Sequence, residues 1–240
     1  MSTQAHPMKI YGQGGPNPPK VIMILEELNL PYEIVPLSTA HSDVKSSAYL
    51  TVNPNGRLPA IQDPNTDLTL WESGAIIEYL IEKYDHTRKL SFEPGSNEAY
   101  LTKQWLFFQT SGQGPYFGQA AWFAKFHHEQ IPSAKERYNA EVARVSGVLE
   151  GWLAKQKEQY GDKAGFDGPW LVGNKISYAD IAFVPWHKII AMILDKDFDE
   201  DKFPLVKKWI RKMSERPAVK KVFEESMAAV VAQRAKEAKE

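Results

Sequence analysis

The sequence predicts two domains of different class, an α/β domain over residues 8–86 and an all-α domain over residues 97–225. Short strand-type and helix-type segments alternate in the first third of the chain, which is the pattern of an α/β layer arrangement. From residue 97 onward the apolar residues recur only at helical spacing. The intervening residues 86–97 are polar and include Pro94 and Gly95, so we interpret them as a linker.

The first domain is expected to follow the order βαβαββα. Apolar, β-branched and aromatic runs predict its strands, and runs rich in Leu, Ile, Met and Glu predict its helices. Leu58–Gln62 and Leu68–Trp71 flank a run of turn-forming residues, which predicts a hairpin. In chain order the expected elements are Met8–Tyr11, Lys20–Leu28, Tyr32–Leu37, Ala48–Leu50, Leu58–Gln62, Leu68–Trp71 and Ser73–Lys83.

Helix-start signals organise the second domain. Ser133–Glu136 has the spacing of a capping box, in which each side chain bonds the other residue's free N–H, and Ser177–Asp180 repeats it. Pro204–Ser214 is expected to be a further helix, because Pro is favoured in the first helical turn. The helix that follows Ser133 carries an apolar stripe made of Tyr138, Val142, Val145, Leu149 and Trp152.

The charge and hydropathy of the chain exclude several classes of protein. Lys plus Arg is 29 and Asp plus Glu is 30, so no broad field attracts nucleic acid or an anionic membrane. No apolar run is long enough to span a bilayer, and Met1–Pro7 lacks a signal-peptide core. We therefore expect a cytoplasmic protein with neither a nucleic acid nor a membrane as its partner.

The chain contains no cysteine, which excludes a disulfide framework, a thiolate metal site and a protein-borne thiol nucleophile. Any thiol chemistry must use a thiol that a ligand brings. The adjacent pair His127–His128 cannot share a helix face, and no His-Glu-x-x-His spacing occurs, so we expect no metal.

Three segments of the first domain have residue types that suit a ligand. Asn17 precedes Pro18, which disfavours helical backbone, and we therefore interpret it as the N-cap at the positive end of a helix dipole. The same residue can serve as a cap and nothing more. Pro59 removes a ladder donor at the start of a strand. A cis Leu58–Pro59 bond would let the N–H and C=O of Leu58 pair with an extended peptide, but X-Pro bonds are cis in only about 5–6% of cases.

The third segment is Trp71–Ile76, where a strand gives way to a helix. Ser73 is expected to cap this helix, whose free N–H groups form an anion site. Glu72, just before it, supplies a negative charge for an ammonium. Together they suit the α-amino acid end of a ligand. The alternative is a plain cap with Glu72 in solvent.

Three segments, in this order along the chain, resemble the glutathione site of glutathione transferases: Pro16-Asn-Pro-Pro-Lys20, Asn55-Gly-Arg-Leu-Pro-Ala60 and Trp71-Glu-Ser-Gly-Ala-Ile76. Ile176-Ser-Tyr-Ala-Asp-Ile-Ala182 matches that family's second-domain motif. Trp105-Leu-Phe-Phe-Gln-Thr-Ser-Gly-Gln-Gly-Pro115 resembles a subgroup around the yeast nitrogen-regulating prion protein, in a wider group with bacterial glutathione-dependent disulfide-bond oxidoreductases. The resemblance implies the glutathione transferase fold, with a thioredoxin-like domain before the α-helical one.

The resemblance also implies roles for individual residues. Glu72 and Ser73 would hold the γ-glutamyl end of glutathione, and Arg57 would help with a carboxylate. The Leu58 backbone, before a cis Pro59, would pair with the cysteinyl unit. The sulfur would then lie near Asn17. Many members activate the thiol with a Tyr, Ser or Cys in this loop; this chain has none there, so Asn17 is the candidate catalytic residue. Arg137 matches a position that reaches glutathione across a dimer interface.

Three functions follow from the resemblance. The first is a detoxifying transferase that uses the glutathione thiolate on small hydrophobic electrophiles. The second is a glutathione-dependent disulfide or peroxide reductase. The third is a non-catalytic, glutathione-binding regulator of a protein partner. Glutathione is the expected cosubstrate in the first two, and a homodimer is expected in each.

Overall fold

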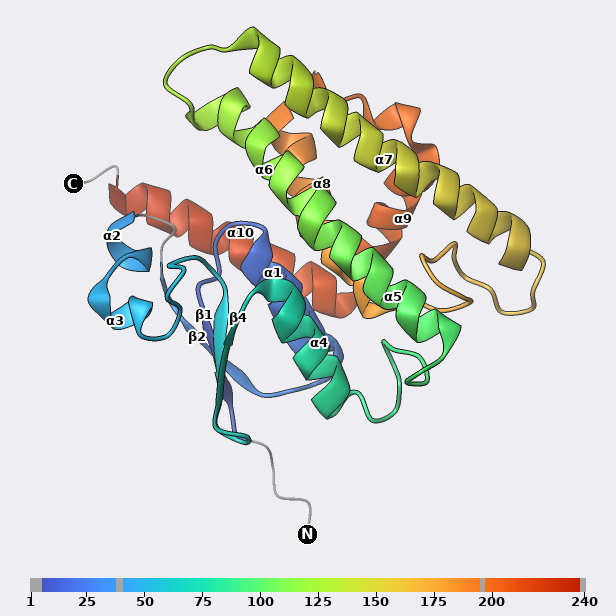
Figure 1. Ribbon diagram of the computed structural model, residues 1–240, viewed down its shortest axis with the longest axis horizontal. Helices are drawn as coiled ribbons and strands as arrows, with labels where there is room; N and C mark the ends of the chain where they lie inside the picture. Colours follow the sequence, from blue (N-terminus) through green and yellow to red (C-terminus); the bar gives the residue numbers. More distant parts are fainter. Residues whose placement is uncertain (1–5, 38–40, 195–196, 238–240) are drawn as a thin grey trace. The chain divides into compact units, whose positions relative to one another are not determined.

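The computed structural model describes residues 6–37, 41–194 and 197–237 (Figure 1). They form two compact units. The first contains the described residues up to Thr87 together with those from Arg216 on, and the second contains Arg88–Glu215. Within the described part of the chain, no helix has the length and apolar character needed to cross a membrane.

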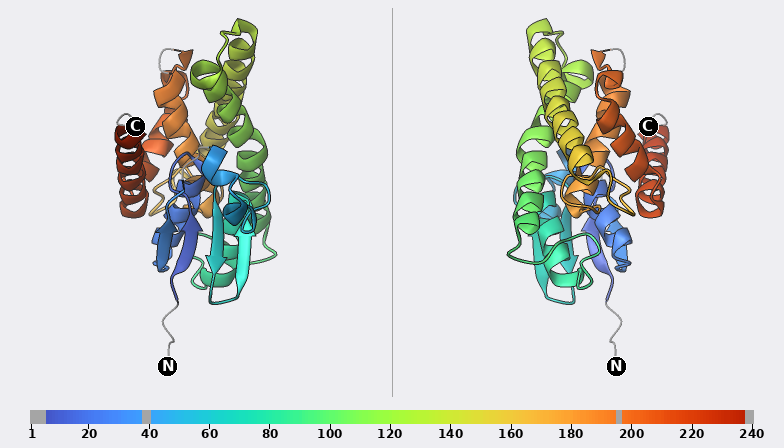
Figure 2. Two further views of the ribbon diagram at one scale, coloured as in Figure 1. Left: turned by 90° about the vertical axis from the view of Figure 1, so that its left-hand side faces the viewer. Right: turned by 90° about the vertical axis from the view of Figure 1, so that its right-hand side faces the viewer.

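The first unit contains a sheet with helices beside it. Its elements are β1 (Met8–Tyr11), α1 (Asn17–Glu27), β2 (Tyr32–Val35), α2 (His41–Val44), α3 (Ser47–Leu50), β3 (Ala60–Asp63), β4 (Leu68–Trp71), α4 (Ser73–Tyr84) and α10 (Pro217–Glu237). The strands lie in the order β2-β1-β3-β4, with β1 parallel to β2 and β3 antiparallel to both β1 and β4 (Figure 2). The predicted βαβαββα order is therefore present, with the short helix α2 in addition.

The two faces of this sheet are covered by different elements, because successive strand residues point to opposite sides. Met8, Ile10 and Ile61 are fully buried, on the face that packs against the apolar sides of α1 and α4. On the other face, Tyr49 of α3 lies in a cluster with Ala60, and Tyr11 packs against it with a ring distance of 5.7 Å. The segment that contains α3 is thereby fixed to the end of β1 and the start of β3.

Helix α10 differs from the expected division, which placed residues 216–225 in the all-α domain. It packs along α1 within the first unit. The buried carboxylate of Glu27 accepts two hydrogen bonds from Arg216, at 2.7 and 2.9 Å. Lys221 donates to Glu26 at 2.6 Å. Paired charges far apart in the sequence thus attach the C-terminal helix to α1.

Several element boundaries differ from the prediction. Helix α1 begins at Asn17 and not at Lys20, because the first helical turn needs no N–H from Pro18 or Pro19. Strand β3 begins at Ala60, after Pro59, which has no N–H to give to a ladder. Strand β2 ends at Val35. Strand β4 has the predicted bounds.

The β3–β4 hairpin is closed by one buried carboxylate. Asp63, which is 1% exposed, accepts hydrogen bonds from the Asn65 N–H and side-chain amide, both at 2.8 Å. It also accepts bonds from the hydroxyls of Tyr79, at 2.6 Å, and of Tyr84. Burial alone would raise the pKa of the Asp63 carboxyl, but these hydrogen bonds outweigh burial and lower the pKa below its ordinary value.

Asp63→Asn is expected to lower the free energy of unfolding by about 2 kcal/mol at pH 7, because an amide is a weaker acceptor for these donors. The folded-state pKa of Asp63 is depressed. Its ionised form therefore contributes stability above the unfolded pKa, and that contribution is lost as the pH falls through the folded pKa. In urea unfolding, the difference between the wild type and the variant should begin to shrink below pH about 4 and should vanish only below the lowered folded pKa.

Asp67→Asn, at an exposed turn residue of the same hairpin with φ 55°, is the matched control. It should change stability by less than about 0.5 kcal/mol, since Asn tolerates the left-handed region. Equal losses in the two variants would show that the buried carboxylate has no special part in closing the hairpin.

The second unit is helical. Its elements are α5 (Asn97–Phe108), the π-helical turn η1 (Gln109–Gln113), α6 (Gly114–Ala121), a second π-helical turn η2 (Trp122–Phe126), α7 (Pro132–Tyr160), α8 (Tyr178–Leu194), the 3-10 helix η4 (Glu200–Lys202) and α9 (Pro204–Ser214). The predicted stripe on α7 is confirmed, since Val142, Val145 and Leu149 are fully buried.

The two predicted capping boxes have different outcomes. The box at Ser133 is wrong, because α7 begins at Pro132 and its cap residue, Ile131, carries no side-chain acceptor. The box at Ser177 is present with a changed pattern. Asp180 accepts from the Ser177 N–H at 2.8 Å, but the Ser177 hydroxyl donates to Asp180 as well, at 2.7 Å. Leu171 N–H and the Trp209 indole complete the partners of this fully buried carboxylate.

Candidate functional site

The sheet register brings the three ligand-type segments to one edge of the first unit. Tyr11 pairs with Ala60, and Ala60 pairs with Trp71. The chain that leaves β1 towards α1, the chain that enters β3 and the chain that leaves β4 towards α4 therefore meet along one edge of the sheet. These stretches contain Asn17, Arg57–Pro59 and Glu72–Ser73.

Leu58 is placed by the loop that precedes it. The Arg57 carbonyl accepts hydrogen bonds from the Tyr49 hydroxyl and from the Asn53 side-chain amide, both at 2.7 Å. Asn53 is 1% exposed, and its other side-chain atom accepts from the Asn55 N–H at 2.9 Å. Gly56 has φ 59°, and a Cβ there would lie 2.6 Å from the Val44 carbonyl oxygen, so only glycine fits this turn.

The Leu58–Pro59 peptide bond is cis, as the resemblance predicts and contrary to the base rate. Within the described part of the chain, neither the N–H nor the C=O of Leu58 has a hydrogen-bond partner. The Leu58 side chain packs on Gly12, where a Cβ would lie only 2.5 Å from Leu58 Cδ1. Leu58 thus presents one backbone donor and one acceptor beside the loop that leads to Asn17.

Glu72 and Ser73 each lie one position further into the helix than expected. Glu72, and not Ser73, is the cap residue of α4, and Ser73 is the first helical residue, 7% exposed. The Glu72 side chain is exposed, and its carbonyl accepts from the Ile76 N–H at 2.9 Å. Its backbone has φ 73° and ψ 113°, outside the regions that side-chain-bearing residues favour. Strain of this kind costs about 1–3 kcal/mol and is concentrated at functional sites.

Asn17 is not the N-cap that its position before Pro18 suggested. Pro16 takes the cap position with helical backbone angles, φ −87° and ψ −17°, and Asn17 is the first residue of α1. The restriction that Pro18 puts on the preceding residue disfavours helical backbone without forbidding it. Asn17 is half-buried and lies in the first turn, where the helix dipole is positive.

Lys20, one turn along α1, is a feature that the sequence interpretation missed. It is 2% exposed, and burial lowers the pKa of its ammonium group to about 7, an effect that the nearby Glu72 carboxylate partly offsets. The only available signal was a single cation within the apolar run Pro18–Leu25. A buried lysine whose pKa is lowered in this way is a candidate functional group by its electrostatics.

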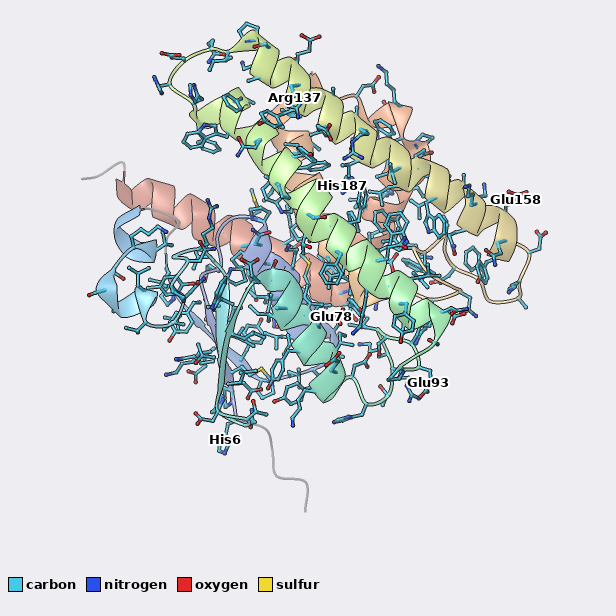
Figure 3. The ribbon with its side chains drawn as sticks, viewed as in Figure 1. His6, Glu78, Glu93, Arg137, Glu158 and His187 are labelled. Carbon is cyan, nitrogen blue, oxygen red and sulfur yellow. The ribbon has the colours of Figure 1, made fainter. Side chains whose placement is uncertain are left out.

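Two arginines predicted for the site are exposed. Arg57 presents its side chain at the surface of the first unit. Arg137 belongs to the second unit, on α7, with its guanidinium 6.0 Å from the centre of the Tyr138 ring (Figure 3). It is therefore not part of the group that the sheet of the first unit brings together. Among the described residues, no cluster of three or more His, Asp or Glu side chains could hold a metal ion.

Comparison with known proteins assigns both units to one family. The model of the glutathione S-transferase N-terminal domain matches residues 15–83, and that of the C-terminal domain matches residues 115–217. The glutathione S-transferase-like protein gedE of Aspergillus terreus is 57% identical over 219 residues, which are 90% of this chain and 94% of that protein. The chain belongs to the glutathione S-transferase family. The family and fold predicted from the sequence are thus confirmed.

Within the glutathione S-transferases, the chain belongs to the Ure2-like group. The crystal structure of the glutathione transferase URE2P6 from Phanerochaete chrysosporium in complex with oxidised glutathione is 46% identical, with a TM-score of 0.82. The match covers 95% of this chain and 98% of that one. Ure2p5 from the same organism, cocrystallised with 1-(S-glutathionyl)-2,4-dinitrobenzene, is 37% identical, with a TM-score of 0.81 and coverage of 95% and 98%.

Proposed function

We propose that this chain is a glutathione transferase that uses the thiolate of bound glutathione to attack small electrophiles. The observation that carries the proposal is the backbone of Leu58, whose N–H and C=O have no partner within the described residues and lie at the same sheet edge as Glu72–Ser73. An extended peptide can pair with this donor and acceptor as a strand would. A γ-glutamyl end then finds the Glu72 carboxylate for its ammonium and the α4 N-terminus for its carboxylate.

In this arrangement Arg57 would supply a positive charge for a second carboxylate. The sulfur would lie near Asn17 and the start of α1. A side-chain amide donor and the positive end of a helix both stabilise a thiolate relative to a thiol. The thiolate would form a carbon–sulfur bond with an aryl halide, and the carbon–halogen bond would break with its electron pair leaving as halide. The proton released from the thiol would pass to solvent.

A glutathione-dependent peroxide or disulfide reductase is the second candidate, and the complex of URE2P6 with oxidised glutathione favours it. The chain has no cysteine, so both sulfur atoms of the disulfide product would have to come from glutathione. Turnover of an aryl halide, an organic hydroperoxide and a mixed disulfide, each with glutathione, would separate the two activities. Binding of glutathione without turnover of any of the three would favour a non-catalytic regulator.

The proposal includes a cytoplasmic homodimer, in which Arg137 would contact glutathione bound to the other copy. Its exposure at the surface of the second unit is compatible with that role. Light scattering at micromolar concentration tests the dimer, and a monomer mass would remove this role for Arg137.

Asn17→Asp is expected to raise the pKa of bound glutathione and to slow conjugation at neutral pH by about ten-fold or more, because an ionised carboxylate repels a thiolate and cannot donate. Stability should be kept, since an acid in the first turn of a helix is favourable. Asn17→Ser keeps a donor and should keep part of the activity.

Thiol ionisation can be followed by ultraviolet absorbance of the glutathione thiolate across pH, with thermal melting as the measure of folding. Full activity and an unchanged thiol pKa in Asn17→Asp would assign thiolate stabilisation to the backbone N–H groups of α1 alone.

A further inference from the structure

The Leu58 N–H, which the proposed function uses as a donor, belongs to a peptide group whose carbonyl oxygen is held by two side chains. The Arg57 carbonyl and the Leu58 N–H belong to one peptide group. This peptide is trans, since the cis bonds of the described chain are Leu58–Pro59 and Gly168–Pro169. In a trans peptide the carbonyl oxygen and the amide hydrogen point in opposite directions. Whatever fixes the Arg57 oxygen therefore also fixes the direction of the Leu58 N–H.

Two side chains fix that oxygen from the interior of the first unit. The Tyr49 hydroxyl, on a residue 3% exposed, and the Asn53 amide, on a residue 1% exposed, each donate to it at 2.7 Å. A carbonyl oxygen has two acceptor sites, so both are used. The Leu58 N–H consequently points away from Tyr49 and Asn53, and within the described residues it meets no acceptor.

The supporting contacts keep these two donors in place. Tyr49 packs in the cluster with Val44 and Ala60, and its ring lies 5.7 Å from that of Tyr11. Asn53 is held at its other side-chain atom by the Asn55 N–H at 2.9 Å. Both donors are thus preorganised before any ligand arrives, which reduces the entropy that binding has to overcome.

We propose that Tyr49 and Asn53 are positioning residues for glutathione, which aim the Leu58 N–H at the carbonyl of its cysteinyl unit. The inference rests on the proposed function and adds to it the source of the site's main-chain geometry. Tyr49 and Asn53 would act through the peptide that joins Arg57 to Leu58, and neither would contact the reacting sulfur.

The test compares Tyr49→Phe with Tyr11→Phe. Each variant removes one hydroxyl from the same aromatic pair, but the Tyr11 hydroxyl donates to Gln62 Oε1, at 2.8 Å, and not to the Arg57 carbonyl. Calorimetry should show about a five-fold loss of glutathione affinity in Tyr49→Phe, the value of one hydrogen bond, and less than two-fold in Tyr11→Phe. The conjugation kcat at saturating glutathione should change little in both.

A second readout reports on the donor itself. In protein labelled with ¹⁵N-leucine, the Leu58 amide signal, assigned by its loss in Leu58→Ile, should move downfield when glutathione is added to the wild type. This glutathione-induced shift should be smaller in Tyr49→Phe than in the wild type, and in Tyr11→Phe it should equal the wild-type shift. If Tyr49→Phe does not fold, Asn53→Ser is used as the test variant, because it removes the other donor to the Arg57 carbonyl.

The inference is overturned if Tyr49→Phe binds glutathione as tightly as the wild type, or if Tyr11→Phe loses as much affinity and amide movement as Tyr49→Phe. The second result would mean that the pair acts only through packing. Absence of glutathione binding by the wild type would overturn the proposed function, and the inference with it.

Discussion

Glu72→Gln is expected to weaken glutathione binding by about ten-fold to a hundred-fold. The reason is the loss of a charge-assisted hydrogen bond to the ligand's ammonium, which contributes about 1.5–3 kcal/mol. Gln is close to Glu in shape and carries the same backbone restriction at φ 73°, so the start of α4 should be unchanged. Calorimetric titration with glutathione measures the effect, and Glu33→Gln, at an exposed residue of β2, is the matched control.

Glu72→Gly separates the carboxylate from the backbone strain. Glycine adopts φ 73° without a steric penalty, so this variant should melt no lower than the wild type. It should nevertheless bind glutathione as poorly as Glu72→Gln. Wild-type affinity in either variant would mean that the γ-glutamyl ammonium is held elsewhere, and the assignment of the ligand's orientation would be wrong.

Adding Ser73→Ala to Glu72→Gln is expected to remove most of the remaining affinity. Ser73 is the first residue of α4, and its hydroxyl and N–H lie where a carboxylate would meet the free donors of that helix. Alanine keeps the N–H and removes the hydroxyl, so the double variant should lie beyond the single one by several-fold. Circular dichroism should show that α4 is intact in both.

The sequence was informative about the strands and the ligand segments, and less so about helix starts. Strand β4 (Leu68–Trp71) was predicted with its observed bounds, because a short apolar run next to turn residues is typical of a hairpin strand. Asn17 and Ser73 were both predicted as caps and are both first helical residues. Which residue is the N-cap depends on the backbone angles of a single residue. Glu72 adopts φ and ψ values that residue propensities do not predict for glutamate.

Long-range features of the site could not be predicted. The cis state of the Leu58–Pro59 bond was predicted from the resemblance alone, since the base rate of X-Pro bonds favours trans. No local pattern shows that Lys20 is buried, or that the Tyr49 hydroxyl donates to the Arg57 carbonyl. These contacts depend on how the strands pair, and pairing is a property of the whole unit.

Arg216→Ala is expected to lower the free energy of unfolding by about 3 kcal/mol, because it leaves the Glu27 carboxylate, 4% exposed, without the guanidinium that faces both of its oxygens. The pair joins the end of α1 to the start of α10 across 189 positions of sequence. The sequence pattern assigns residue 216 to the all-α domain, so the size of this effect also measures how firmly α10 belongs to the first unit. Urea unfolding with an unchanged m-value is the measurement.

Arg211→Ala provides the comparison, since Arg211 pairs with Glu215 at 3.1 Å on the exposed surface of α9, and an exposed pair of this spacing contributes about 0.5 kcal/mol or less. Replacing both partners, as Glu27→Leu with Arg216→Met, should recover much of the stability lost in Arg216→Ala, because the buried carboxylate is then removed together with its guanidinium. If Arg216→Ala lowered the free energy of unfolding no more than Arg211→Ala, the Glu27–Arg216 pair would contribute no more to stability than an exposed ion pair. The attachment of α10 to α1 would then rest on apolar packing, and the double replacement would raise stability above the wild type.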